Sequence, residues 1–319
     1  MSDTESDNEY DAIVVGGGAA GLSAALVLTR ARRRVAVVDG GRPRNAPAAH
    51  MQGFLSRDGL PPAELVEMGR AEVTRYGGHL VEDTVSGVVR HEGPRFDVRL
   101  ASGTTLATRR VIVATGLRDE IPDVAGAWDR WGRDLLHCPY CHGHEVRDEP
   151  LGVLGQGSGP VQHALLVRQW SPDVVLFTHG STPTAEERQQ LSARGIVVDD
   201  RPVRRLVVED DELRGVELDD GSVVARRAVF VRPRFVPHSD LLVGLGCATG
   251  DDGWPVVDPT GATTVPGVWA AGNVANPRAQ VITAAGEGSA AAIALNNDLV
   301  DEDVRHALTY ATTEQGATT

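Results

Sequence analysis

The order of apolar and polar stretches along the chain predicts two related α/β units, one nested inside the other. Ala12–Val15 is a short apolar run, and the small residues Gly16–Gly21 separate it from a stretch with helical character, Leu22–Arg30. A second apolar run, Val35–Val38, ends at Asp39. Short apolar runs bounded by glycine turns are typical of buried parallel strands, so we expect strand, turn, helix and strand in this part of the chain.

The same pattern returns further along. Arg109–Gly116 predicts another buried strand that ends in a turn, and Gly152–Leu154 begins a second unit, whose next strand spans Asp173–Phe177. The remaining expected elements are a hairpin over Glu209–Asp220, a strand over Ala225–Val231, a strand and turn over Gly267–Asn273, an alanine-rich helix over Gln280–Leu299 and a disordered small-residue tail from Ala311.

The first turn carries a dinucleotide-binding pattern. Gly16, Gly18 and Gly21 have the GxGxxG spacing between a predicted strand and a predicted helix. Small residues at these positions let the backbone approach a pyrophosphate, and the helix N-terminus faces its charge. Asp39, at the end of the second strand, is placed to accept a hydrogen bond from a ribose hydroxyl.

Composition narrows the class of protein. The chain has 319 residues, enough for two domains, and a net charge of −13, which argues against binding nucleic acid or an anionic membrane surface. It contains no lysine, which excludes a Walker-type phosphate lysine and Schiff-base chemistry. Three cysteines are too few for a secreted disulfide scaffold, and the acidic N-terminus is not a signal peptide, so we expect a cytoplasmic protein.

Two of the three cysteines form a C-x-x-C box, Cys138 and Cys141, with His137 before it and His142 after it. At the start of a helix, the peptide dipoles and nearby cations lower the pKa of the first thiol, and a neighbouring imidazole exchanges its proton near neutral pH. Half of a zinc site and an inert buried pair are the alternatives. A second ligand pair is missing, so we expect no metal site, and Cys247 is interpreted as a small buried hydrophobe.

These motifs, in this order, resemble the low-molecular-weight thioredoxin reductase family of flavoproteins over about Tyr10–Leu299. The resemblance implies an α/β fold of two nested Rossmann-like domains with three-layer ββα architecture. FAD would bind to a discontinuous domain, 1–118 plus 238–310, and 119–237 would form an inserted, NADPH-domain-like module that carries the cysteines, followed by the disordered tail 311–319. Members of the family form homodimers through the FAD domain, so we expect a homodimer.

The resemblance also implies a set of FAD contacts. The helix that follows Gln280 would direct its N-terminus at the flavin and stabilise negative charge on reduction. Asn273 stands where the family has aspartate, and would still bond to a ribityl hydroxyl. The full expected set is Gly16, Gly18, Ala19, Ala20, Gly21, Asp39, Gly40, Arg44, Asn45, His50, Val85, Thr115, Gly116, Gly272, Asn273, Gln280 and Val281.

The second glycine-rich turn, Gly155–Pro160, departs from the family pattern. Pro160 replaces the small residue at the sixth position, and its missing N–H removes a phosphate contact. Members that use NADPH carry a His-Arg-Arg cluster after the next strand, whereas only His179 remains here. Losing two charge-assisted contacts costs roughly 3–6 kcal/mol, unless another arginine such as Arg168 or Arg188 replaces them.

The box Cys-Pro-Tyr-Cys-His-Gly, preceded by His137, is similar to one branch of the family, the dithiol oxidases of gliotoxin- and holomycin-type natural products. That branch implies catalytic roles for Asn45 and His137. We therefore expect an FAD-dependent oxidase that converts a small dithiol into a disulfide through Cys138 and Cys141, with His137 or His142 as base and molecular oxygen as acceptor. A reductase driven by NADPH or ferredoxin and a non-enzymatic flavin redox sensor are the alternatives.

Overall fold

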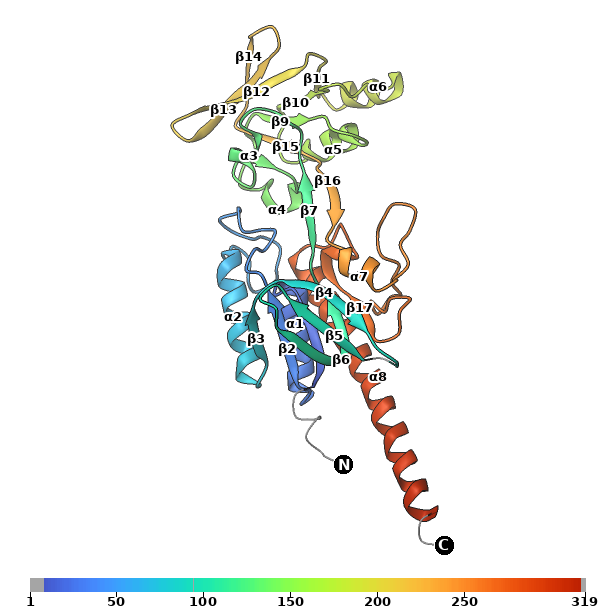
Figure 1. Ribbon diagram of the computed structural model, residues 1–319. Helices are drawn as coiled ribbons and strands as arrows, with labels where there is room; N and C mark the ends of the chain where they lie inside the picture. Colours follow the sequence, from blue (N-terminus) through green and yellow to red (C-terminus); the bar gives the residue numbers. More distant parts are fainter. Residues whose placement is uncertain (1–8, 94, 317–319) are drawn as a thin grey trace. The chain divides into compact units, whose positions relative to one another are not determined.

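The computed structural model describes residues 9–93 and 95–316. The chain divides into two compact units (Figure 1). Unit 1 runs to Arg44, continues over Ala63–Arg118 and resumes at Pro237, whereas unit 2 comprises Asn45–Pro62 and Asp119–Val236. Two of the breaks fall inside β7 (Leu117–Glu120) and β16 (Arg234–Pro237), two strands that pair with each other.

Unit 1 is built on a seven-stranded sheet with the order β3-β2-β1-β6-β5-β4 and with β17 also paired to β6. Strands β3, β2, β1, β6 and β17 are parallel to one another, whereas β5 pairs with β6, and β4 with β5, in antiparallel fashion. The bounds are β1 Tyr10–Val15, β2 Val35–Asp39, β3 His79–Glu82, β4 Val85–Arg90, β5 Phe96–Leu100, β6 Thr105–Val113 and β17 Val268–Ala270.

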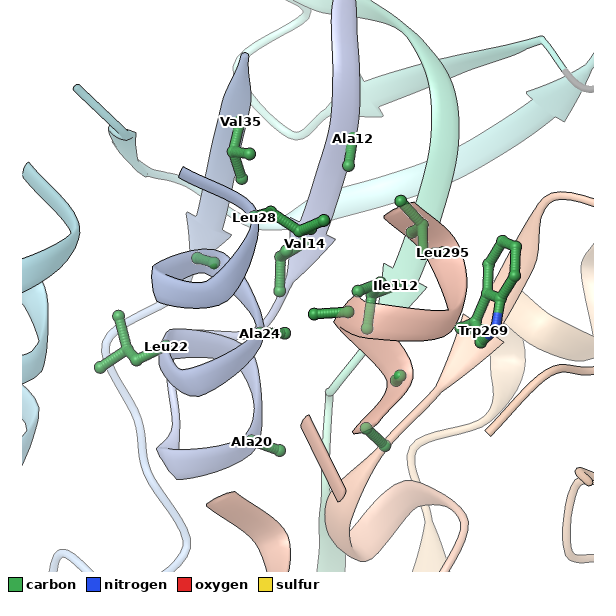
Figure 2. Close-up of a cluster of buried hydrophobic side chains, with 14 of the residues drawn as sticks. Ala12, Val14, Ala20, Leu22, Ala24, Leu28, Val35, Ile112, Trp269 and Leu295 are labelled. Carbon is green, nitrogen blue, oxygen red and sulfur yellow. The ribbon is translucent and has the colours of Figure 1, made fainter. Parts of the chain in front are cut away.

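Helices α1 (Ala19–Arg30) and α8 (Val281–Gly316) pack on one face of the parallel strands (Figure 2). Leu22 and Leu28 of α1 and Leu295 of α8 are buried with residues of β1 and β6. The two helices approach closely, because a Cβ atom on Gly288 would lie 2.0 Å from the carbonyl oxygen of Ala20. Burying each of the leucines contributes about 1.5–3 kcal/mol, so this contact anchors the start of α1, where the GxGxxG turn ends.

The opposite face of the parallel strands is also covered. Ala12 and Val14 point into the cluster under α1 and α8, whereas Ile13 and Val15 belong to a second cluster that includes residues of β4, β5 and α7 (Asp240–Gly244). Alternate residues of a strand face opposite sides, so a strand buried on both faces reads as a continuous apolar run. This is why Ala12–Val15 could be assigned from its sequence.

Unit 2 contains a parallel five-stranded sheet, β11-β10-β9-β15-β8, and an antiparallel three-stranded sheet, β12-β13-β14. The strand bounds are β8 Leu135–Leu136, β9 Leu151–Leu154, β10 Val174–Phe177, β11 Val197–Asp199, β12 Val203–Glu209, β13 Glu212–Leu218, β14 Val223–Ala225 and β15 Ala228–Val231. Further helices in the described part of the chain include α2 Pro62–Arg75, α3 Ala127–Arg130, α4 Pro139–His142, α5 Pro160–Val167, α6 Ala185–Ala193 and the 3-10 turn η2 Gly272–Val274. The α/β fold class expected from the sequence is confirmed in both units.

Three features differ from the sequence-based expectations. The segment 45–62 groups with unit 2, where a Cβ on Gly132 would lie 2.8 Å from the Cβ of Pro47. The predicted hairpin Glu209–Asp220 is part of a three-stranded sheet whose first strand begins at Val203. Helix α8 continues to Gly316, where a disordered tail was expected from Ala311, because no glycine or proline lies between Gly288 and Gly316; residues 317–319 lie outside the described residues.

None of the described helices combines the length and the apolar character needed to cross a bilayer.

Candidate active site

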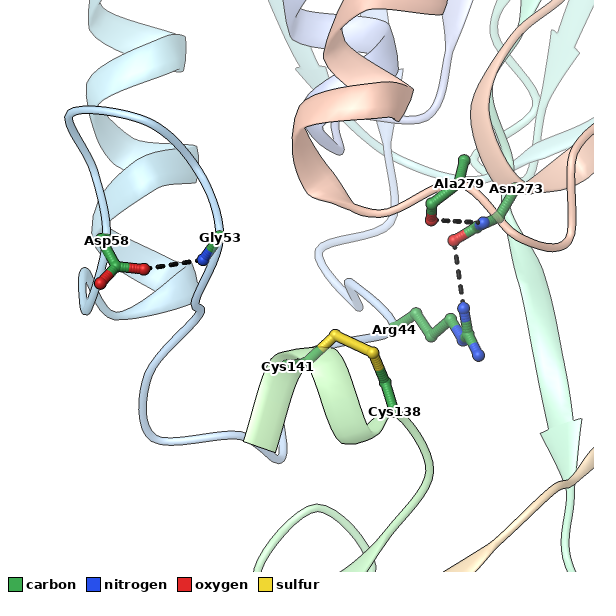
Figure 3. The surroundings of a disulfide bond; sticks show 7 residues. All are labelled: Arg44, Gly53, Asp58, Cys138, Cys141, Asn273 and Ala279. Atoms are coloured by element: carbon green, nitrogen blue, oxygen red, sulfur yellow. Dashed lines mark hydrogen bonds between the residues drawn. A yellow bond between two sulfur atoms is a disulfide. The ribbon is translucent and has the colours of Figure 1, made fainter. Parts of the chain in front are cut away.

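The cysteine pair opens the single-turn helix α4 in unit 2 (Figure 3). Cys138 is the N-cap residue and forms a disulfide with Cys141, with their Cα atoms 5.2 Å apart. Pro139 occupies the first helical position, where its missing N–H breaks no hydrogen bond. The pair, called the redox pair below, therefore lies at the positive end of a short run of peptide dipoles, which favours a thiolate after reduction.

The far end of α4 is held by Trp170. A Cβ on Gly143 would lie 2.8 Å from the indole ring, so a larger residue could not occupy this position without a shift. The ring of Tyr140 stands edge-on to the same indole, with centroids 5.5 Å apart, while its side chain remains 65% exposed. Nothing in the sequence pattern singled out Trp170, because its role depends on contacts between distant segments.

Two histidines flank the redox pair in different environments. His142, inside α4, has its pKa lowered by burial, which the charge of Glu145 opposes only in part. A histidine with a lowered pKa is neutral at neutral pH and can accept a thiol proton. His137 follows β8, and its imidazole lies edge-on to Phe235, at 5.1 Å between centroids, and parallel to the ring of His163, at 6.2 Å. His144 is exposed.

In unit 1, the GxGxxG turn leaves an open space only where a pyrophosphate would need it. Gly16 has a φ of +107°, and a Cβ there would lie 2.4 Å from the carbonyl oxygen of Ala114. A Cβ on Gly21 would lie 1.8 Å from the oxygen of Gly16, whereas a Cβ on Gly18 would meet nothing within 4 Å. No side chain caps α1 at Gly18 and no acidic residue lies in its first turn, so the turn fits the pyrophosphate of FAD.

Other residues of the expected FAD set surround this turn. A Cβ on Gly17 would lie 2.7 Å from a carboxylate oxygen of Asp39, so Asp39 lies beside the turn, as a ribose contact requires. A Cβ on Gly40 would lie 3.1 Å from the hydroxyl of Thr84, directly before Val85. Ala19 and Ala20 form the first turn of α1.

Thr115, Gly116, Gln280 and Val281 lie at the ends of elements of unit 1. The Thr115 hydroxyl donates to the carbonyl oxygen of His238 at 2.7 Å, and Gly116 has a φ of +70°. Gln280 directly precedes α8, which begins at Val281, so the helix N-terminus is formed where the sequence placed it.

Asn273 uses its side-chain amide to organise the loop before α8 (Figure 3). Its Nδ2 donates to the carbonyl oxygens of Asn276 and Ala279 at 2.9 and 3.0 Å, and its Oδ1 accepts from Arg44 at 3.2 Å. An aspartate could accept from Arg44 but could not donate to two carbonyls. The difference from the family's aspartate therefore has a structural reason, which the sequence analysis did not anticipate.

Asn45 and His50 lie in unit 2 together with the redox pair, whereas all the other residues of the expected FAD set lie in unit 1. The boundary falls between Arg44 and Asn45. The structure thus divides the sequence-predicted set between the two units, and it leaves the roles of both residues as predictions.

The second glycine-rich turn precedes α5. Pro160 is in the first helical position, after Gly159 with a φ of +90°. A Cβ on Gly159 would lie 2.7 Å from the guanidinium of Arg232, a residue that the sequence analysis did not consider. Arg232 forms no hydrogen bond or ion pair with any residue in 9–93 or 95–316, and is exposed.

Arg168 and Arg188, the possible replacements for the two arginines that hold the 2′-phosphate in NADPH-using members, bond to other groups. Arg188 forms two hydrogen bonds with Asp200, at 2.9 and 3.0 Å, and Arg168 donates to the carbonyl oxygens of Arg194 and Ser171. His179 accepts a hydrogen bond from the backbone N–H of Val203 at 3.1 Å, and burial lowers its pKa. None of these three side chains is therefore poised to hold a 2′-phosphate.

Two nested dinucleotide-binding units, one with an open GxGxxG turn and one with a C-x-x-C disulfide, define a flavoprotein disulfide oxidoreductase. Comparison with known proteins supports this class. The chain belongs to the pyridine nucleotide-disulphide oxidoreductase family, whose sequence profile matches residues 10–288.

The chain is also similar to individual members. It is 33% identical to thioredoxin reductase sirT of Leptosphaeria maculans over 92% of this chain and 96% of that protein. It is 30% identical to thioredoxin reductase aclD of Aspergillus oryzae, over 92% and 98%. The crystal structure of HlmI superposes with a TM-score of 0.94 at 61% identity, covering 95% of this chain and 96% of that one. The expected thioredoxin reductase-like architecture and the FAD cofactor are thereby confirmed.

Proposed function

We propose that this FAD-dependent oxidoreductase is a dithiol oxidase. It takes two electrons from a small molecule bearing two thiols and returns that molecule as a disulfide. The observation that carries the proposal is the contrast between an intact redox pair on α4 and the region after β10, where Arg188 is held by Asp200 rather than available to a 2′-phosphate. Electrons then enter at sulfur rather than from a nicotinamide.

The exchange on the redox pair balances without an external reagent. A substrate thiolate attacks Cys138, the Cys138–Cys141 bond breaks, and Cys141 leaves as a thiolate. The second substrate thiolate attacks the substrate sulfur of the mixed disulfide, which releases Cys138 and the cyclic product. His137 or His142 takes the protons that the substrate thiols lose.

Bound FAD supplies the two-electron acceptor that returns the reduced pair to the disulfide, and we propose molecular oxygen, reduced to hydrogen peroxide, as the final acceptor. Gly16, Gly18 and Gly21 would hold the pyrophosphate of FAD, and Asp39 would hold its ribose. Asn273 would act through the loop it organises before α8.

The charges that follow β10 support the transfer of electrons from substrate thiols, rather than from NADPH, to the redox pair. Asp200, which pairs with Arg188, has its pKa lowered mainly by that arginine, and a hydrogen bond with Thr178 places its carboxylate near the end of β10. A carboxylate at this position disfavours a 2′-phosphate, because like charges repel. The arginine beside it is already neutralised.

A second candidate is a reductase, and Arg232 favours it. Its guanidinium lies beside Gly159 without an ion-pair partner among the described residues, at a turn that retains two glycines with positive φ. A pyrophosphate could bind there. The reductase would send electrons from NADPH or ferredoxin to the redox pair, and relatives such as sirT carry the name thioredoxin reductase.

An anaerobic titration separates the two functions. The FAD-loaded protein is mixed with dithiothreitol, with NADPH or with NADH, and flavin absorbance is followed. For an oxidase we expect bleaching with the dithiol, which Cys141→Ser abolishes, and little with either nucleotide. Bleaching by micromolar NADPH, with none by the dithiol, would reject the oxidase. Cys247→Ser is the control, because Cys247 is buried, unpaired and outside α4.

We also propose a homodimer. Helix α8 carries exposed apolar side chains at Ile282, Ile293, Val300, Val304 and Leu308, whose spacing brings them to one face. A second copy could cover this stripe. Sedimentation of the wild type against Ile293→Glu tests it: a dimer that the variant weakens is expected, and a monomeric wild type contradicts it.

A further inference from the structure

A second histidine, His163 on α5, stacks on His137, and its imidazole makes no hydrogen bond with any described residue. The two rings are parallel within 1°, with centroids 6.2 Å apart. His163 is 7% exposed, and its Nε2 is buried without a partner. An unpaired buried nitrogen costs stability, and leucine or phenylalanine would fill this space without that cost. Stability alone therefore does not account for a histidine here.

His163 is itself held firmly. Its backbone N–H donates to the carbonyl oxygen of Gly159 at 3.1 Å, and its ring lies 6.3 Å from the ring of Phe230, tilted by 59°. On the other side, Phe235 stands edge-on to His137 at 82°. The four rings form a continuous row, Phe230–His163–His137–Phe235, within unit 2, in the distance range of aromatic contacts.

We infer that His163 is a positioning residue that holds the imidazole of His137 in one plane beside Cys138. The inference rests on the proposed function, in which a histidine next to the redox pair takes a thiol proton. Proton transfer requires the ring nitrogen within hydrogen-bond reach of sulfur, so a ring that already lies in a fixed plane loses less conformational freedom on reaching that geometry.

The charge state of His163 suits this role. Burial and, to a smaller extent, the charge of Arg232 lower its pKa to about 4, so His163 is neutral at neutral pH. The stack then places no second positive charge beside His137 when His137 takes a proton. Other charged or titratable groups on elements near the stack are His142 of α4, Arg234 of β16, and Glu186, Glu187 and Arg188 of α6, the helix that packs against α5.

The test uses the FAD-loaded full chain with His163→Leu and His163→Phe. Both side chains fill the space without an unpaired nitrogen, but only phenylalanine keeps a flat ring. His179→Leu is the matched control, because burial also lowers the pKa of His179, which lies after β10. Two quantities are measured: the rate of anaerobic flavin reduction by dithiothreitol against pH, and the NMR titration of the labelled His137 imidazole, assigned with His137→Gln.

We expect His163→Leu to lower the rate about tenfold and to change the shift and pKa of His137, whereas His163→Phe stays within about twofold of wild type on both measures. The control should leave His137 unchanged. Wild-type behaviour of His163→Leu, or equal loss in both variants, overturns the inference. If dithiothreitol fails to reduce even the wild type, the proposed oxidase fails, and the NMR titration of His137 still decides the positioning role.

Discussion

Replacing two glycines of the same turn by alanine should affect different properties, protein stability at Gly21 and FAD affinity at Gly18. Gly21→Ala places a Cβ 1.8 Å from the carbonyl oxygen of Gly16, a contact that neither backbone segment can relieve locally. Gly18→Ala places a Cβ in open space, at a φ of −79° that alanine adopts without strain. If that space receives the pyrophosphate of FAD, Gly18→Ala should weaken FAD binding without destabilising the fold, whereas Gly21→Ala should destabilise the fold itself.

The magnitudes follow from these contacts. Overpacking a core costs about 1–3 kcal/mol, so Gly21→Ala should lower the melting temperature of the apoprotein by roughly 2–10 °C. Gly18→Ala should change apoprotein stability by less than about 1 kcal/mol. Losing one charge-assisted contact to the pyrophosphate is worth about 1.5–3 kcal/mol, so its FAD affinity should fall roughly ten- to 150-fold.

Thermal unfolding of the apoproteins, followed by circular dichroism, gives the first quantity, and titration with FAD, followed by flavin fluorescence, gives the second. Gly18→Ala with wild-type FAD affinity would show that the open space does not receive the pyrophosphate. Gly21→Ala as stable as wild type would show that the turn can move, and the steric argument would be wrong.

Three further results are expected. Glu302→Gln should destabilise the protein by about 3–5 kcal/mol in urea unfolding, because the Glu302 side chain is only 7% exposed and its carboxylate compensates the charge of buried arginines. The control Asp301→Asn, at an exposed neighbouring position, should change stability little, and equal effects of the two substitutions would contradict this. Below pH 6.5, His163 binds a proton in the unfolded chain but not in the native protein, where its pKa is about 4. The free energy of unfolding should therefore fall by roughly 3 kcal/mol as the pH is lowered from 6.5 to 4, and it should fall less in His163→Phe; identical pH profiles would refute this. A thiol reagent should leave the native oxidised protein unlabelled and label only the redox pair after dithiol reduction, because burial raises the pKa of the Cys247 thiol; labelling of Cys247 would contradict this.

The sequence alone determined the features that depend on neighbours along the chain. Strand β1, the glycine turn, α1 and β2 follow from runs of apolar residues and from steric demands that recur locally. The placement of Pro139 and Pro160 at helix starts follows in the same way, since proline fixes its own φ and lacks an N–H. For these elements, the residues that decide the structure are within a few positions of each other.

Tertiary structure decided everything that joins distant segments. The stack of His163 on His137, the pairing of Arg188 with Asp200 and the hydrogen bond of Arg44 to Asn273 all depend on which surfaces the sheets bring together. The grouping of Asn45 with the redox pair rather than with the FAD residues has the same origin. Side-chain hydrogen bonds and ring contacts act over a few ångströms in space, and sequence separation carries no information about them.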